Sequence, residues 1–507
     1  MKHPSLLIKG VSMRRPLTLN LFTLALLTLL IAACGDSASQ SAPPTSAAST
    51  NPSQISPTLG DASVHLKQAI DYYAGGHYDD AINEYTQAIQ LRSDYADAYT
   101  GRCQAYNSKG EYGNSFLDRQ AYDDAVTDCN KAISLNPNNA AAYYNRGVAY
   151  KNTSQYDQAI TDLTKAIKLK SDYADAYARR CWAYEHKYQY DIALADCNQA
   201  LTLDPNNYIA YNARGNVYNS QNHPDEAIAD FGRAITLRSD FAAPYYNRCA
   251  SYVNAGRYDD AITDCNQDIK LKPDDADAYV ARAVAYDGKK LYDQAIADFN
   301  QAIKLNPNLA GAYLYRGKAF SAKGQDDRAL GDYTQAIKLE PNNANMYTPR
   351  ALSYINKGEY DQAIADCNVA IRLDPSLAEA YFDRGYAYSD KKLYDLALAD
   401  YTQAIKLNPN YSDAYNNRGA TYVIEGQPDL AIADYDKAIS LDPNNALAYN
   451  NRGKVYEAKG NKEKAVADFK KVLAVSNDPQ LLNDAEQHLK NLGVGGLEIT
   501  ARTLSRY

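Results

Sequence analysis

The sequence predicts an all-α protein built from about twelve copies of a two-helix unit. The chain repeats every 34 residues from residue 62 to residue 479. Within each copy, small or apolar residues at positions 4, 8 and 11 fall on one helical stripe, and those at positions 20, 24 and 27 fall on another. Tyr supplies 46 of the 507 residues, against 8 Phe and 1 Trp, as expected when one short pattern is copied many times.

The chain begins with a predicted targeting segment, residues 1–33. A basic start ending in Arg14 and Arg15 precedes a mostly apolar run, which is the order found in a signal peptide. The sequence Ile31-Ala32-Ala33-Cys34 resembles the lipobox of bacterial lipoproteins, and this implies cleavage before Cys34 and attachment of lipid, including palmitate, to its sulfur. The alternative is an uncleaved anchor helix with an incidental cysteine. Either way, we expect a body outside the cytoplasm, anchored to a membrane of the bacterial cell envelope.

The remaining segments follow from composition and period. Residues 34–61 are rich in Ser, Ala, Pro and Thr and predict a disordered linker after the lipidated cysteine. The predicted copies are 62–95, 96–139 (with ten extra residues, 113–122, expected to lengthen a turn and form a second contact site), 140–173, 174–207, 208–241, 242–275, 276–309, 310–343, 344–377, 378–411, 412–445 and 446–479. An array of this kind needs a cap, and residues 480–492 predict a capping helix with an apolar face. Residues 493–507 predict a flexible tail.

Each copy resembles the tetratricopeptide repeat (TPR). In the copy 140–173, the positions that define the family hold Tyr143, Gly147, Tyr150, Ala159, Leu163, Ala166 and Ser171. The resemblance implies a right-handed superhelical solenoid of helix-turn-helix units with the first helices on its concave face. It also implies protein or peptide partners. Two further positions carry local signals: Asp at position 18, in eleven copies, predicts an N-cap of the second helix, and Gly at position 15, in seven copies, predicts a left-handed turn after the first.

Arginine and acidic residues recur in register. Position 7 is Arg in eleven copies, from Arg102 to Arg452, and position 23 is acidic in all twelve. The first copy has Gln68 instead of Arg, which suggests that each Arg pairs with the acid of the preceding copy, as Arg102 with Glu84 and Arg146 with Asp128. We therefore expect an inter-copy ladder that fixes the rotation between copies. A row of solvated charges is the alternative.

Seven of the eight cysteines also follow the repeat. Every copy with Cys at position 8 has Cys at position 24, and these positions face each other across the two helices. Because such pairs can oxidise outside the cytoplasm, we predict the disulfides Cys103–Cys129, Cys181–Cys197 and Cys249–Cys265. Cys367, opposite Ala351, is expected to be free. Small buried thiols in helix contacts are the alternative.

The variable first-helix positions predict the binding surface. Position 6 holds Asn145, Asn247, Asn417 and Asn451, which partly resembles the asparagine ladder by which some family members hold a peptide backbone. Aromatic residues expected on the same face are Tyr144, Trp182, Tyr246, Phe382 and Tyr386. Ordinary solvated helix residues remain the alternative for all nine.

No residue pattern indicates catalysis. The six histidines lack partners at metal-ligand spacing, and there is no phosphate-binding loop, so we expect no enzyme activity, no cofactor, no metal and no small-molecule substrate. The net charge of −8 disfavours nucleic acid. Asp268 replaces the usual Ala at position 27 and predicts a partly exposed substitution, with a tuned carboxyl as the alternative. The first hypothesis is an interaction scaffold at the cell envelope; the second is a structural component of an envelope complex, such as a secretion or surface-appendage machine.

Overall fold

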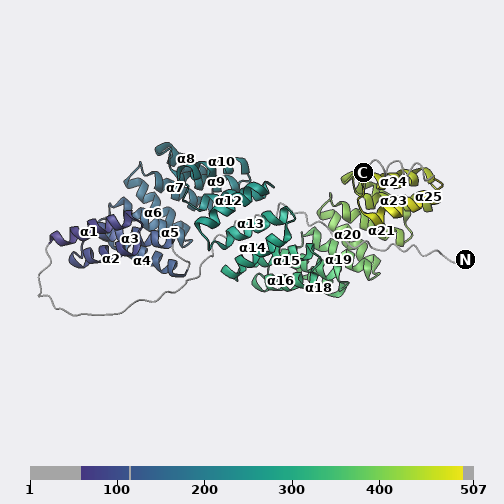
Figure 1. Cartoon of the computed structure of the whole chain (residues 1–507), viewed down its shortest axis with the longest axis horizontal. Coiled ribbons are helices and arrows are strands. Elements are labelled where there is room, and N and C mark those ends of the chain that lie inside the picture. The colour runs from purple at the N-terminus through teal and green to yellow at the C-terminus, as the bar shows by residue number, and fades with distance from the viewer. Residues whose placement is uncertain (1–58, 113–115, 495–507) are drawn as a thin grey trace. The chain divides into compact units, whose positions relative to one another are not determined.

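The computed structural model describes residues 59–112 and 116–494 (Figure 1). These residues form 25 α-helices and one short 3-10 helix, and none of them forms a strand, which confirms the predicted all-α solenoid. The signal peptide, Cys34, most of the predicted linker and residues 495–507 lie outside the described residues. Within the described residues, no helix is long and apolar enough to cross a membrane.

The chain divides into two compact units, and the boundary between them in the described sequence falls between Ala312 and Tyr313. The described part of the N-terminal unit contains α1 (Leu59–Ala74), α2 (Tyr78–Leu91), α3 (Ala96–Tyr112), α4 (Phe116–Leu135), α5 (Ala140–Asn152), α6 (Tyr156–Leu169), α7 (Ala174–Glu185), α8 (Tyr190–Leu203), α9 (Tyr208–Ser220), α10 (Pro224–Leu237), α11 (Ala243–Asn254), α12 (Tyr258–Leu271), α13 (Ala276–Gly288), α14 (Tyr292–Leu305) and the start of α15 (Ala310–Ala322).

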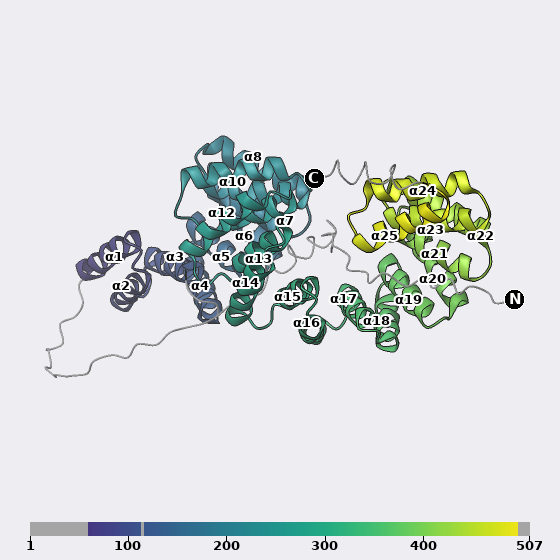
Figure 2. The same cartoon turned by 45° about the vertical axis from the view of Figure 1, so that its right-hand side comes forward.

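The C-terminal unit contains the rest of α15, ten further α-helices and one 3-10 helix (Figure 2). These are α16 (Asp326–Leu339), η2 (Ala344–Met346), α17 (Tyr347–Asn356), α18 (Tyr360–Leu373), α19 (Ala378–Asp390), α20 (Tyr394–Leu407), α21 (Ser412–Ile424), α22 (Pro428–Leu441), α23 (Ala446–Ala458), α24 (Lys462–Val475) and α25 (Pro479–Asn491), with η2 the 3-10 helix. Helix α25 packs Leu481, Ala485 and Leu489 against α24, as a capping helix does.

Side-chain volume explains how the two helices of a copy approach each other. Where position 8 is Gly, position 24 holds a large side chain: a Cβ added to Gly215 would lie 2.6 Å from Cε1 of Phe231, and one added to Gly317 would lie 2.6 Å from Cε1 of Tyr333. Ala at position 20, such as Ala227, is fully buried in the same contact. Each glycine at position 8 thus makes room for one large apolar side chain, which fills the space between the two helices.

The turn after the first helix has the predicted left-handed residue. Gly256 has φ of 70° at position 15, and the Arg257 N–H then donates to the Tyr252 carbonyl at 2.8 Å. In five other copies a residue with a side chain takes the same conformation, and Tyr188, with φ of 59°, is the largest of them. The turn geometry is therefore set by the repeat, because these residues adopt it without glycine.

Two local expectations were wrong. The second helix begins at position 17, so Asp259 at position 18 already lies inside α12, and Arg257 is the N-cap residue with no side-chain cap bond. The ten-residue insert does not simply lengthen a turn, because α4 starts at Phe116 and takes up most of it. Its proposed role as a second contact site is not tested by this geometry.

Candidate interaction surface

The arginines at position 7 pair with the acid of their own copies. In copy seven, Arg282 donates from Nε to Oδ2 of Asp298 and from Nη2 to Oδ1, both at 2.7 Å. The acids are buried, with Asp298 8% exposed and Asp230 3% exposed. The pairing predicted between neighbouring copies was therefore wrong for the carboxylate, and the solvated charge row is excluded for these buried acids. The two helices of one copy are tied by a two-pronged, charge-assisted contact.

The third donor of the same guanidinium provides a link between copies. Nη1 of Arg282 donates to Oδ1 of Asn266, at position 25 of the preceding copy, at 2.6 Å. Other arginines do the same with the Thr, Asn or Asp at that position: Arg102 with Thr86, Arg146 with Asn130, Arg180 with Thr164, Arg214 with Asn198, Arg350 with Thr334, Arg384 with Asn368, Arg418 with Thr402 and Arg452 with Asp436. Each of these arginines thus fixes both its own helix pair and the stacking on the previous copy.

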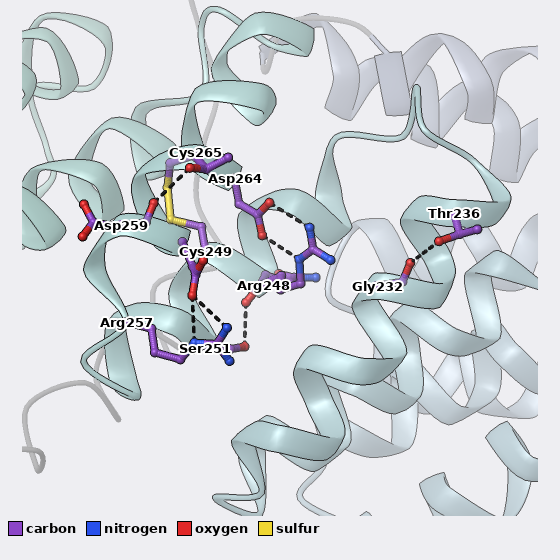
Figure 3. A network of polar contacts seen from close by, with 12 residues as sticks. Gly232, Thr236, Arg248, Cys249, Ser251, Arg257, Asp259, Asp264 and Cys265 are labelled. Atoms are coloured by element: carbon purple, nitrogen blue, oxygen red, sulfur yellow. Dashed lines mark hydrogen bonds and ion pairs between the residues drawn. A yellow bond between two sulfur atoms is a disulfide. The ribbon is translucent and has the colours of Figure 1, made fainter.

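Copy six shows a variation of this link (Figure 3). Arg248 binds Asp264 as the others do, with Nε to Oδ2 at 2.6 Å. Position 25 of the preceding copy is Gly232, which has no side-chain acceptor, and the Cβ that a larger residue would carry there lies 3.3 Å from Nη1 of Arg248. Thr236 donates to the Gly232 carbonyl at 2.9 Å.

The first copy lacks the arginine for a structural reason. It has no preceding copy to supply a position-25 acceptor, and its acid, Glu84, lies 2.5 Å from Nδ1 of His65. The sequence exception at Gln68 therefore did indicate an inter-copy role for the arginine. It did not show which of the guanidinium donors performs that role.

The structure joins the same three cysteine pairs that the repeat pattern suggested. Cys249 and Cys265 link α11 to α12 with a Cα–Cα distance of 5.6 Å (Figure 3). Cys181–Cys197 and Cys103–Cys129 link α7 to α8 and α3 to α4. Cys367 is free and fully buried, and burial raises the pKa of its thiol well above the ordinary value. A buried thiol of this kind is poorly reactive.

The four candidate asparagines are held in different ways. Asn145 is 5% exposed, so its side chain is not available to a partner. Asn247 donates to Oδ1 of Asn212 at 3.0 Å, and Asn451 donates to Oδ1 of Asn416 at 3.1 Å. Both bonds run from position 6 to position 5 of the preceding copy.

Asn417 belongs to the second of these amide chains. Its Oδ1 accepts from Nδ2 of Asn416 at 3.1 Å. These amides thus connect neighbouring first helices. A bound peptide would either replace these amide–amide hydrogen bonds or bind the amide atoms that take no part in them.

The aromatic candidates divide by burial. Phe382 is 1% exposed and packs against Tyr401 and Tyr411. It therefore belongs to the core, and its prediction as a binding residue was wrong. Tyr144, Trp182, Tyr246 and Tyr386 are partly exposed. Burial raises the pKa of Tyr386 to about 12, so this phenol stays neutral at physiological pH.

Trp182, on the first helix of copy four, is the centre of an aromatic cluster with residues of α5, of the start of α6 and of the end of α7. Its ring stacks on His186 with centroids 3.6 Å apart, and Tyr156 meets its edge at 5.8 Å. Nζ of Lys151, from the preceding copy, lies 4.5 Å from the Trp182 ring centroid. The sequence indicated Trp182 but not the three residues that hold its ring in place.

Asp268 is not the partly exposed substitution that was expected. It is 1% exposed in α12, and neither carboxyl oxygen has a hydrogen-bond partner. Burial raises its pKa to about 8, with the charge of Asp275 adding to the shift and that of Lys272 opposing it. The tuned carboxyl is therefore the correct alternative. It stands alone, since no cluster of three or more metal-binding side chains exists in the part of the chain that the structure describes.

The geometry defines a class of protein, the solenoids of stacked antiparallel helix pairs. Models described as TPR repeat match residues 69–110, 113–154, 351–392 and 419–460. Others described as tetratricopeptide repeat match residues 140–173, 197–229, 276–309, 312–343, 378–411, 400–433 and 446–479. Together the matches cover more than half of the chain, which therefore belongs to the tetratricopeptide repeat family.

Solved structures of similar fold include large TPR proteins. The crystal structure of the APC/C hetero-tetramer Cut9–Hcn1 is 15% identical, with a TM-score of 0.48, and the similarity covers 84% of this chain and 96% of that one. Yeast Tom70 is 17% identical with a TM-score of 0.42, covering 80% of this chain and 99% of that one. MamA is 33% identical with a TM-score of 0.29, covering 34% and 96%. Comparison with curated proteins gave no match.

Proposed function

We propose that this protein is a membrane-anchored scaffold outside the cytoplasm that binds extended segments of partner proteins along its first-helix face. The TPR fold itself is that of protein–protein interaction scaffolds. The observation that carries the choice of face is the Trp182 cluster, where a large ring is fixed by neighbours yet stays partly exposed. Rigid aromatic anchors of this kind supply much of the energy at protein interfaces.

Two features support the location. The lipobox-like Ile31–Cys34 would supply lipid, and three cysteine pairs at bonding distance suit an oxidising compartment. Stable attachment needs more than one acyl chain, which lipoprotein processing would provide. Cys34→Ser should abolish labelling of the protein by radioactive palmitate and release it from the membrane fraction. Unchanged labelling and sedimentation would contradict the anchor.

The binding proposal is tested by crosslinking in intact cells followed by mass spectrometry, with a pull-down of the partners found. Trp182→Ala should reduce recovery of these partners at least tenfold, because it removes the anchor. Tyr188→Ala is the matched control, since Tyr188 is 67% exposed in the turn after the same helix. Asn417→Ala with Asn451→Ala should also weaken recovery.

The alternative function is a structural component of an envelope complex, such as a secretion or surface-appendage machine. It would use the ends and outer face of the solenoid. Crosslinks confined to second helices, together with normal recovery by the Trp182→Ala variant, would favour this alternative and exclude the scaffold proposal.

A further inference from the structure

Four exposed aliphatic side chains lie on two consecutive copies of the C-terminal unit. Leu393 and Leu396 belong to copy ten and are 43% and 49% exposed; Ile424 and Leu430 belong to copy eleven and are 46% and 49% exposed. Leu393 precedes α20, Leu396 lies in its first turn, Ile424 ends α21 and Leu430 lies in the first turn of α22. Helices α20 and α21 pack on each other, so these side chains share the edge where first helices turn into second helices.

The repeat itself shows that the fold does not require these leucines. Leu396 and Leu430 occupy position 19, which is polar or charged in nine of the twelve copies. The third apolar residue at this position is Ile192, also 49% exposed. Since other copies fold with a polar residue at this position, the exposed leucines are not needed for packing. Exposed aliphatic side chains on two neighbouring copies are typical of a contact surface.

The charges along this edge change at the same place. In at least six copies, Lys at position 14 binds Asp at position 18 of the preceding copy: Lys109 with Asp79, Lys187 with Asp157, Lys289 with Asp259, Lys357 with Asp327, Lys391 with Asp361 and Lys459 with Asp429. Between the last two pairs, position 14 is Glu425 and position 18 of the preceding copy is Asp395. The junction between copies ten and eleven therefore has two acids where its neighbours have an ion pair.

Both acids are exposed, and so is Lys392, the base next to Leu393. Asp395 and Glu425 carry two negative charges and Lys392 carries one positive charge, so this edge is acidic next to its aliphatic residues. The like charges at one junction also repel each other, so that a positive group from outside would be attracted to both.

We propose that Leu393, Leu396, Ile424 and Leu430, together with Asp395 and Glu425, form an acidic leucine surface that docks a basic amphipathic helix of a partner protein. A helix of this kind presents one apolar stripe for the leucines and flanking Lys or Arg side chains for the two acids. The surface lies on the turn edge and uses none of the residues assigned above to peptide binding, so it constitutes a second, independent site. The acids oppose docking on an anionic membrane.

The test uses the full chain and a fluorescent peptide of about 18 residues with Leu on one helical face and Lys on the other, a length of ~27 Å. Binding is followed by fluorescence anisotropy at low and high salt. The peptide should bind, and salt should weaken its binding, because the acids contribute. A matched peptide with Glu in place of each Lys should bind at least tenfold more weakly.

Two variants locate the site. Glu425→Lys should weaken binding at least tenfold while keeping the fold, because it recreates the Lys–Asp pair present in at least six other copies. Leu396→Gln with Leu430→Gln should do the same, since both changes introduce polar residues that the repeat accepts at this position. Ile192→Gln is the control, at the same position with the same exposure, and should leave binding unchanged.

Equal binding of the Lys and Glu peptides, or equal binding by Glu425→Lys and the unaltered chain, would overturn the proposal. Sedimentation of the full chain with anionic vesicles that is lost in the double leucine variant would overturn it in favour of a lipid surface. Trp182→Ala should leave peptide binding intact, which separates this site from the first-helix face.

Discussion

Replacing Asp268 with alanine should stabilise the protein, and the gain should grow with pH. The carboxyl is 1% exposed, its two oxygens have no hydrogen-bond partner, and its pKa is raised to about 8. In the unfolded chain an aspartate titrates near 3.9. The folded state therefore holds its proton over a pH range in which the unfolded state has lost it, so folding stability falls as pH rises from about 4 to about 8.

The size of the effect follows from the difference between the two pKa values. Each pH unit in that interval costs about 1.4 kcal/mol, which amounts to about 1.5 kcal/mol at pH 5 and about 4 kcal/mol at pH 7. Asp268→Ala removes this cost and restores the residue found at position 27 in ten copies. The urea midpoint of the variant should exceed that of the unaltered chain slightly at pH 5 and much more at pH 8.

Hydrogen exchange gives the local counterpart of that measurement. Amides of α12 and α13 should exchange more slowly in the variant at pH 8, while those of α5 and α6 should not change. Asp264→Ala is the control with the opposite expected effect. The Asp264 carboxylate binds Arg248, so removing this carboxylate should destabilise the protein at neutral pH. A gain from Asp268→Ala that is the same at pH 5 and pH 8 would refute the reasoning, because the buried carboxyl would then not control the pH dependence.

Three further predictions concern the contacts that hold the two helices of a copy together. Arg282→Ala should lower stability by about 3 kcal/mol, because it leaves a buried carboxylate without its partner; an unchanged melting curve would contradict this. Ala351→Cys should form a fourth disulfide with Cys367 and stabilise by about 3 kcal/mol in the loop-entropy account, and a thiol count on the denatured, unreduced protein should fall by one. Gly215→Ala should destabilise by about 2 kcal/mol, because its Cβ would clash with a buried ring, whereas Gly331→Ala, with nothing within 4 Å, should not destabilise in the same urea titration.

The period of the sequence was enough to predict the helix pairs, because small and large residues alternate in register with the helical stripes. The cysteine pairs could be predicted for the same reason: two positions that face each other changed together. The Arg–Asp pairing could not be assigned, since a guanidinium has five donors and the sequence does not say which neighbour each one reaches. Asp259 was misjudged as a cap because its helix starts two residues earlier than the pattern suggested, with Arg257 as the N-cap residue.

Burial was the least predictable property of the candidate site. Asn145 and Phe382 occupy first-helix positions whose burial differs from copy to copy: both are buried, whereas Asn247 and Tyr246, at the same two positions of copy six, are partly exposed. The amide bonds of Asn247 and Asn451 to position 5 of the preceding copy likewise involve a residue type that varies between copies. A single-copy pattern contains no information about such pairs.

The cysteine bridges have a mechanical consequence when the protein is stretched from its two ends. Each bridge closes a loop inside one helix pair, spanning 16 residues in Cys181–Cys197 and Cys249–Cys265 and 26 in Cys103–Cys129. When the chain is pulled, a bridged copy can release only the residues outside its loop, so a 16-residue loop withholds roughly 50 Å of extension. Copies two, four and six would then yield in short steps and the unbridged copies in longer ones, and a reductant would lengthen the short steps.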